Sequence, residues 1–158
     1  MKRSVYIETT IISYLTARRT RDELRNGQIG LTRQWWTDAA ERFDLRVSAL
    51  VIAEASAGDA GAAAERLQAI AGLSVLDITP EAESLARSLL LGTALPAKAN
   101  RDALHVAIAA TNGLDFLLTW NCRHLANATL RRRIESVCSD HGYNPPLICT
   151  PQELQEVA

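Results

Sequence analysis

Short apolar runs alternate with longer stretches of helical character along the whole chain. The runs are rich in aliphatic and β-branched side chains and stop at polar residues, as buried strands do. They cover residues 5–7, 46–48, 74–78, 115–119 and 147–149. Because short strands that alternate with helices build a parallel sheet with helices on both faces, the pattern predicts a three-layer α/β fold.

Helix signals fill the segments between these runs. Thr79 and Pro80 form a strong start, with a capping hydroxyl followed by proline at the first helical position. The almost wholly apolar segment 103–110 indicates a helix that is buried on most sides. Helices are expected at residues 11–15, 22–42, 50–58, 59–70, 80–92, 100–112 and 128–140, and a last one is expected to begin at Pro151.

Length and composition narrow the class of protein. The chain has 158 residues, 47% of them apolar and 22% charged, which is ordinary for one globular domain spanning residues 1–158. No apolar run approaches the roughly 18 to 20 residues that cross a bilayer, and Glu8 interrupts the only stretch a signal peptide could use. Three cysteines without a CxxC spacing favour the reducing cytoplasm over a disulfide framework or a zinc site. We therefore expect a cytoplasmic protein without a membrane segment.

Polar residues at the carboxyl ends of the predicted strands form the candidate site. Ligands of open parallel sheets bind beyond these ends, and the net charge of −1 gives no competing global signal. The positions that meet this rule are Glu8 after the first strand, Glu54 in the helix after the second, Asp102 at the start of the buried helix and Asn121 after the fourth strand. The sequence has no GxGxxG, GxxxxGK[ST], GxSxG or HExxH motif, so dinucleotide, P-loop, serine-hydrolase and zincin chemistries lose support.

Three carboxylates brought to one place need a cation. Glu8 stands between the apolar segments 5–7 and 11–12, where an unpaired carboxylate would be costly to bury. Carboxylate oxygens without a histidine-rich or cysteine-rich partner set suit the hard cations Mg²⁺ and Mn²⁺. A metal of this kind can supply a nucleophilic water and stabilise a phosphoryl group in transfer. The sequence therefore favours hydrolysis of phosphodiesters.

The candidate residues stand in motifs that resemble the PIN-domain family, and within it the VapC-type toxins of bacterial toxin–antitoxin pairs. The resemblance covers nearly the whole chain and lies in the order and spacing of the motifs. They are YIETT at residues 6–10, IAE at 52–54, RDALHVAIA at 101–109 and LLTWN at 117–121, followed by RHL at 123–125. Glu8 stands where the family usually has aspartate, and Asn121 stands where it often has a fourth acid.

The resemblance implies an α/β/α PIN-like domain that acts as a Mg²⁺-dependent ribonuclease. It also implies a cognate antitoxin that blocks the active cleft, and commonly a homodimer. Carried over to this chain, Glu8, Glu54 and Asp102 would hold Mg²⁺ or Mn²⁺. Asn121 would take the place of the fourth acid, and Thr10 would support the site by hydrogen bonding. We accordingly expect an endoribonuclease that hydrolyses RNA, in which the missing charge at Asn121 weakens a second metal more than the first.

Two other functions fit the same sequence. A non-catalytic PIN domain that binds RNA or a partner protein is suggested by Glu8 and Asn121, and it predicts RNA affinity that does not respond to a chelator. A small α/β phosphohydrolase acting on metabolites is the third hypothesis, although the chain lacks a glycine-rich loop to cradle a phosphate.

A basic loop and two histidines carry weaker hypotheses. Arg18, Arg19 and Arg21 follow the first short helix, where they would either contact RNA phosphates or form a solvated loop. His105 lies one helical turn after Asp102 and is expected to be a core histidine, with a place in the site as the alternative. The same alternatives apply to His124, close after the fourth strand.

Overall fold

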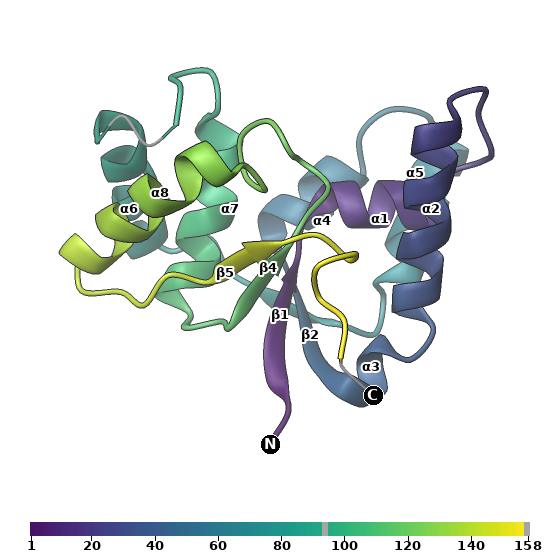
Figure 1. Cartoon of the computed structure of the whole chain (residues 1–158), viewed down its shortest axis with the longest axis horizontal. Coiled ribbons are helices and arrows are strands. Elements are labelled where there is room, and N and C mark those ends of the chain that lie inside the picture. Colours follow the sequence, from purple (N-terminus) through teal and green to yellow (C-terminus); the bar gives the residue numbers. More distant parts are fainter. Residues whose placement is uncertain (93–94, 157–158) are drawn as a thin grey trace.

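The computed structural model describes residues 1–92 and 95–156, and it contains a five-stranded parallel sheet (Figure 1). In sheet order the strands are β3 (Ser74–Leu76), β2 (Phe43–Ser48), β1 (Arg3–Ile7), β4 (Phe116–Leu118) and β5 (Leu147–Cys149). The register places Tyr6 opposite Leu117 and Ile7 opposite Leu118, so β1 and β4 end together. The parallel sheet predicted from the alternating pattern is confirmed.

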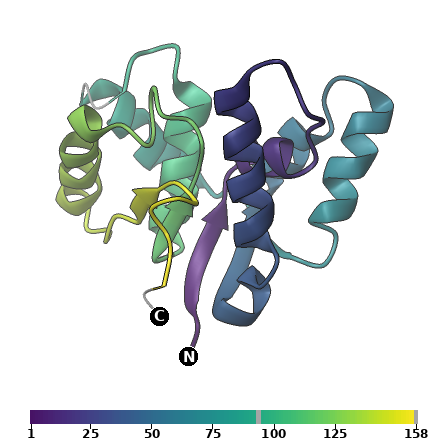
Figure 2. The same ribbon diagram turned by 45° about the vertical axis from the view of Figure 1, so that its right-hand side comes forward.

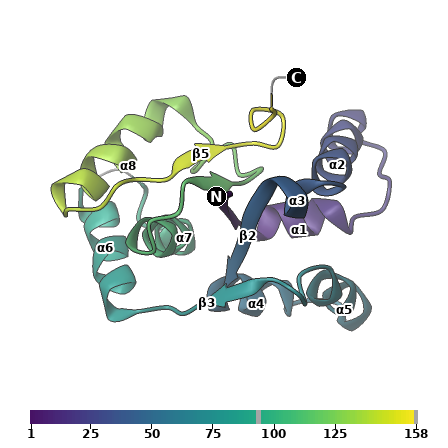
Figure 3. The ribbon, with the colours of Figure 1, turned by 90° about the horizontal axis from the view of Figure 1, so that it is seen from below.

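Helices cover both faces of this sheet. One group consists of α1 (Thr9–Leu15), α2 (Glu23–Trp36), α3 (Ala39–Arg42), α4 (Ala49–Ala55) and α5 (Ala60–Ala69). The other consists of α6 (Pro80–Leu91), α7 (Asn100–Thr111) and α8 (Ala128–Asp140). Seen from below, the two groups lie on opposite sides of the strands (Figure 3). The loops before α2 and before α7 both extend past the carboxyl end of β1 (Figure 2).

Local signals account for most helix starts. Thr79, which precedes Pro80, accepts a hydrogen bond from the Ala82 amide, and Asp59 accepts one from the Ala62 amide, as capping residues do. The predicted burial of α7 is also confirmed, because His105 and the five residues after it are all buried. Packed against β1 and β4, this helix fixes its first turn at the carboxyl end of the sheet.

The single long helix predicted over residues 22–42 is wrong. The chain forms α2 and α3 instead, with a break at Thr37 and Asp38. Threonine and aspartate favour helix ends over helix interiors because their side chains compete for backbone hydrogen bonds. Here the Thr37 hydroxyl donates to the Arg33 carbonyl, and Asp38 pairs with Arg42. The break turns the chain so that it enters β2 at Phe43, earlier than predicted.

The helix predicted from Pro151 is not formed over residues 151–156, and residues 157–158 of that prediction lie outside the described part. Thr150 and Glu153 exchange hydrogen bonds between side chains and backbone amides, which closes a single turn. Beyond the turn, Leu154 packs into the core and its carbonyl accepts a hydrogen bond from the Trp35 indole at 2.9 Å. This contact anchors the chain after its single turn to α2.

Other differences concern element ends. The helix predicted from residue 11 begins at Thr9, and the strands predicted at 74–78 and 115–119 are shorter, ending at Leu76 and Leu118. Among the described residues, no helix combines the length and apolar character needed to cross a membrane.

Candidate metal site at the carboxyl end of the sheet

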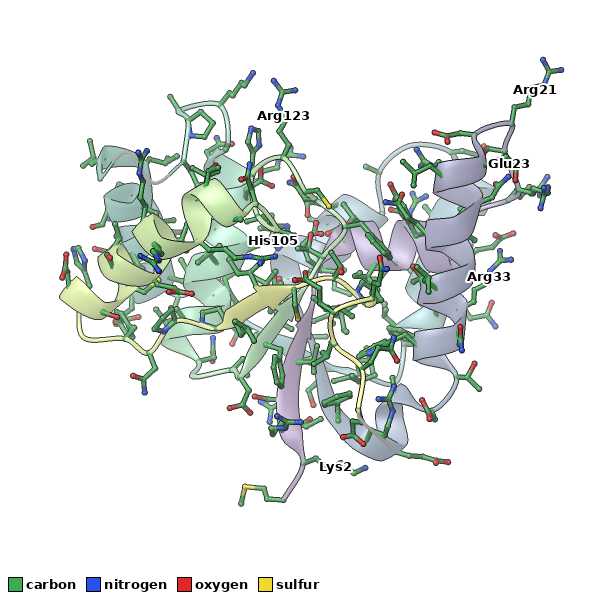
Figure 4. The ribbon with its side chains drawn as sticks, in the orientation of Figure 1. Lys2, Arg21, Glu23, Arg33, His105 and Arg123 are labelled. Atoms are coloured by element: carbon green, nitrogen blue, oxygen red, sulfur yellow. The ribbon has the colours of Figure 1, made fainter. Side chains whose placement is uncertain are left out.

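The candidate residues gather where the central strands end. Glu8 directly follows β1, Asn121 comes shortly after β4, and Asp102 lies in the first turn of α7. Glu54 lies in the last turn of α4, the helix that directly follows β2. Figure 4 shows the labelled His105 at this same end of the sheet. Parallel strands bring these elements together because all of them end at one edge of the sheet.

Glu8 is a buried carboxylate that two hydroxyl groups hold in place. Its side chain is 4% exposed, and its Oε1 atom accepts hydrogen bonds from Thr10 and, at 2.6 Å, from Thr119. None of the ion pairs in the described residues involves Glu8. A buried carboxylate without a balancing cation is costly, so the surroundings of Glu8 fit a bound cation.

Glu54 is partly buried and more strongly tied to its neighbours. Its Oε1 atom accepts hydrogen bonds from the Thr9 hydroxyl and from His105 Nε2, both at 2.6 Å. Its Oε2 atom lies 3.9 Å from the guanidinium of Arg101, which is largely exposed. Burial by itself raises the pKa of Glu54, but the hydrogen bond and charge of His105, together with Thr9 and Arg101, lower it below its ordinary value. Glu54 is therefore held in its ionised form.

Glu8, Glu54 and His105 form one compact group of candidate ligands. One ligand atom from each residue lies within 4.8 Å of the others. The two carboxylates that the sequence placed together do meet, and carboxylate oxygens are the donors that Mg²⁺ and Mn²⁺ prefer. The donor set therefore fits a hard divalent cation.

Asp102 lies in a second, adjoining cluster. One carboxylate oxygen accepts a hydrogen bond from the Asn121 side-chain amide at 3.1 Å, and the other lies 3.0 Å from His124 Nδ1. Asn121 in turn accepts a hydrogen bond from the His124 backbone amide. The amide of Asn121 thus acts toward Asp102 as a donor, which an aspartate at this position could not do.

Two threonines tie Glu8 to the chain at the end of β4, and one of them, Thr119, connects it to the cluster around Asp102. The Thr119 hydroxyl donates to Glu8 and accepts from the Asn121 backbone amide at 2.9 Å. The Thr10 hydroxyl donates to Glu8 and accepts from the Trp120 backbone amide, also at 2.9 Å. The end of β4 and the start of α1 are thereby locked to the same carboxylate.

His105 is the residue whose place the sequence left open. It is 1% exposed, as expected for a core histidine, yet both ring nitrogens face the site network: Nε2 contacts Glu54 and Nδ1 lies 2.6 Å from the Tyr6 hydroxyl. The signal in the sequence is the spacing of three residues from Asp102 on one helix, which places both side chains on neighbouring positions of the same face.

The basic loop lies apart from the carboxylates. Arg18, Arg19 and Arg21 are exposed or nearly so, and Arg19 pairs with Glu23 in an ion pair whose side chains are each 76% exposed. Arg21 and Glu23 stand at the outer tip of the molecule (Figure 4). Arg18 lines a surface pocket of about 500 Å³ together with Arg25 and other residues of α1, α2 and α5.

Comparisons with known proteins give structural matches only. No protein-family model matches the chain, and no curated protein matches its sequence. A chain of VapBC2 from Rickettsia felis, solved bound to a DNA fragment from their promoter, matches with a TM-score of 0.57 and 15% identity over 93% of this chain and 98% of that chain. VapC20 from Mycobacterium tuberculosis, a sarcin-ricin loop cleaving toxin, matches with a TM-score of 0.57 and 16% identity over 90% of this chain and 99% of that chain.

These likenesses extend over nearly the whole of both partners and define the fold. The chain has the α/β/α architecture of VapC-type PIN-domain proteins. The fold class predicted from the strand and helix pattern, and the architecture implied by the family resemblance, are both confirmed.

Proposed function

We propose that this chain is a Mg²⁺- or Mn²⁺-dependent endoribonuclease and the toxin of a VapC-type toxin–antitoxin pair. The observation that carries the proposal is the buried carboxylate of Glu8 beside the ionised carboxylate of Glu54, at the strand ends of a VapC-like fold. Burying one carboxylate beside a second, ionised one is costly, and a bound cation would offset that cost. The similarity to VapC20, which cleaves RNA of the sarcin-ricin loop, supports RNA as the substrate class.

Glu8, Glu54 and Asp102 would hold the cation, and Asn121 would support the site through Asp102. When bound, Mg²⁺ supplies an activated water and stabilises charge that develops on the phosphoryl group. The chain's own residues orient the ligands: Thr10 and Thr119 hold Glu8. In the same way, Asn121 holds Asp102 through its side-chain amide.

Positive charge at the rim would position the RNA. Arg101 is adjacent to Asp102 and its side chain is 74% exposed, so its guanidinium can pair with a phosphate next to the carboxylates. Arg18, Arg19 and Arg21 would extend the contact along the loop before α2. Their exposure and distance from the carboxylates suit contacts to flanking phosphates, which add affinity without base specificity.

A protein partner belongs to the same proposal. The match to a chain of the VapBC2 complex supports a cognate antitoxin, and we propose that it covers the carboxylate cluster of this chain. We further propose that the protein is cytoplasmic, acts as one domain over residues 1–158 and forms a homodimer.

Cleavage of RNA by the purified chain tests the proposal. Total RNA is incubated with Mg²⁺ or Mn²⁺, with and without a chelator, and with the variants Asp102→Asn and Glu41→Gln. Glu41 is exposed on α3, just before β2 and so at the opposite end of the sheet, and its variant removes one acidic charge as a matched control. Discrete cuts that the chelator and Asp102→Asn abolish, and that Glu41→Gln retains, are the expected result.

Cleavage retained by Asp102→Asn would exclude this assignment. Intact RNA under every metal, together with chelator-insensitive RNA binding, would favour the non-catalytic PIN domain. That alternative is suggested by Glu8 and Asn121, which differ from the residues that the family usually has at these positions. Turnover of phosphomonoesters without RNA cleavage would point to a metabolite phosphohydrolase.

A further inference from the structure

A continuous chain of hydrogen bonds leads from Glu54 into the core. Glu54 Oε1 lies 2.6 Å from His105 Nε2, and His105 Nδ1 lies 2.6 Å from the Tyr6 hydroxyl. The Tyr6 hydroxyl lies 2.7 Å from the Ser48 hydroxyl. Tyr6 and Ser48 are fully buried and His105 is 1% exposed. All three therefore depend on one another for their hydrogen bonds.

The first link of this chain has a fixed direction. An ionised carboxylate only accepts, so the hydrogen between Glu54 and His105 belongs to Nε2. The other ring nitrogen, Nδ1, shares a hydrogen bond with the Tyr6 hydroxyl. Tyr6 and Ser48 share the next hydrogen bond, and Ser48 Oγ accepts from the Val51 amide at 3.2 Å. Whichever atoms donate inside the core, the hydrogen on Nε2 is the one that holds Glu54.

We propose that His105 is a positioning residue and not a ligand of the cation. It fixes Glu54 by donating to the Oε1 atom, which leaves Oε2 to bind the cation. This inference rests on the proposed function. Nε2 can donate a hydrogen or bind a cation through its lone pair, but it cannot do both at once. His105 therefore lies close to Glu8 and Glu54 because it donates a hydrogen bond to Glu54.

The hydrogen-bonded residues come from different elements of the fold, which explains how His105 alone can fix the position of Glu54. Ser48 caps the start of α4, and Glu54 lies in the last turn of the same short helix. Tyr6 comes from β1 and His105 from α7. The hydrogen bonds therefore tie both ends of α4 to two other elements. With these bonds in place, Glu54 cannot turn its carboxylate without breaking a buried link.

Removing a residue that orients a metal ligand by hydrogen bonding typically weakens metal binding by ten- to a hundredfold. Mn²⁺ binding is measured by calorimetry on the full chain without RNA, for the wild type and for His105→Ala, His105→Gln and His141→Gln. The glutamine amide at residue 105 can still donate to Glu54, and His141 is an exposed control at the end of α8. We expect affinity to fall at least tenfold in His105→Ala, to recover to within about threefold in His105→Gln and to be unchanged in His141→Gln.

The protonation pattern of His105 gives a second readout that needs no variant of the site. Nitrogen-15 spectra of the wild type should show a hydrogen on Nε2 in the metal-free protein, retained when Mg²⁺ saturates the site. Loss of this hydrogen on Mg²⁺ binding would overturn the inference, even if both His105 variants failed to fold.

The outcomes separate the inference from the function on which it rests. Wild-type protein that binds Mn²⁺ and cleaves RNA, with His105→Gln as weak as His105→Ala, would overturn the positioning role alone. A strong preference for Zn²⁺ that His105→Gln abolishes would do the same, because imidazole ligands favour that metal. Wild-type protein without any Mn²⁺ binding would remove the proposed function and this inference together.

Discussion

Each glutamate of the candidate site is anchored through one carboxylate oxygen. Hydroxyls from α1 and from the end of β4 hold Oε1 of Glu8, while Thr9 and His105 hold Oε1 of Glu54. These partners lie on other elements of the fold, so the carboxylates keep their direction without a bound cation. The geometry favours ligands that are oriented in advance, which reduces the cost of ordering them when a cation arrives.

Asn121 provides a prediction at the scale of one residue. Asn121→Asp replaces the donor to Asp102 with a second acceptor and sets two carboxylates against each other. Without metal, we expect the free energy of unfolding to fall by about 1–3 kcal/mol, because a partly buried acceptor loses its hydrogen bond. Mn²⁺ should close this gap, since the added charge strengthens cation binding. Urea unfolding with Mn²⁺ or with a chelator measures both effects.

Asn127→Asp is the matched control for this change. Asn127 caps α8 by accepting from the Thr129 amide, a role that aspartate fills equally well. Mn²⁺ should change the stability of Asn127→Asp no more than it changes the stability of the wild type. An Asn121→Asp protein as stable as the wild type in chelator would contradict the donor role of Asn121.

Glu54 gives a prediction for the dependence of stability on pH. Its folded pKa lies below the ordinary value, so its ionised form stabilises the fold above the unfolded pKa of about 4.3. That contribution is lost as the pH falls through the folded pKa. Glu54→Gln keeps the acceptor oxygen but does not titrate. Urea unfolding at pH 7 and at pH 3.5 should show a smaller loss of stability in Glu54→Gln than in the wild type, and equal losses would contradict the lowered pKa.

The sequence located the candidate carboxylates and, through the family resemblance, the supporting Thr10, but it did not locate their other partners. Glu8 and Glu54 were predictable because each follows a strand of a parallel sheet, where topology alone brings residues together. The hydrogen bonds of His105 were not, because they depend on side-chain directions from β1, α4 and α7 at once. The pairing of Asp102 with Asn121 and His124 likewise depends on how the loop after β4 folds back.

At the scale of elements, local chemistry and tertiary contacts contribute separately to the outcome. The start of α6 at Pro80 follows from the cap and the proline. The break after α2 also has local causes in the side chains of Thr37 and Asp38, although the hydrophobic pattern did not reveal it. The end of the chain at Leu154 depends instead on the buried Trp35, whose indole donates to the Leu154 carbonyl. That contact joins segments far apart in sequence, so no local pattern reveals it.

The cap of α4 tests this distinction between local and tertiary contributions. Ser48→Ala removes the cap and also the hydroxyl partner of buried Tyr6. We expect a loss of about 1 kcal/mol from the cap and a further loss of about 0.5–1.5 kcal/mol from the lost hydrogen bond to Tyr6, whose hydroxyl keeps its contact with His105. Thr79→Ala removes the cap of α6 alone and should cost about 1 kcal/mol. Urea unfolding compares the two, and equal losses would show that the Tyr6 link contributes nothing.

At the scale of the whole molecule, the candidate site joins the two helix groups through the central strands. Glu54 comes from α4 on one side and Asp102 from α7 on the other, while Glu8 directly follows β1, the strand between them (Figure 3). A cation held by these residues would connect both sides of the sheet. Metal binding should therefore stabilise the cooperative fold and not one loop of it.

Thermal unfolding measures this coupling. A ligand at one hundred times its dissociation constant stabilises the folded state by about 2.7 kcal/mol, which corresponds to a rise in Tm of roughly 5–10 °C for a chain of this size. We expect Mg²⁺ or Mn²⁺ to raise the Tm of the wild type and of Glu41→Gln by this amount. Glu8→Gln should remove most of the rise, because it takes away the buried charge that the cation balances. A rise of the same size in Glu8→Gln would place the metal elsewhere on the molecule, and no rise in the wild type would contradict the metal site itself.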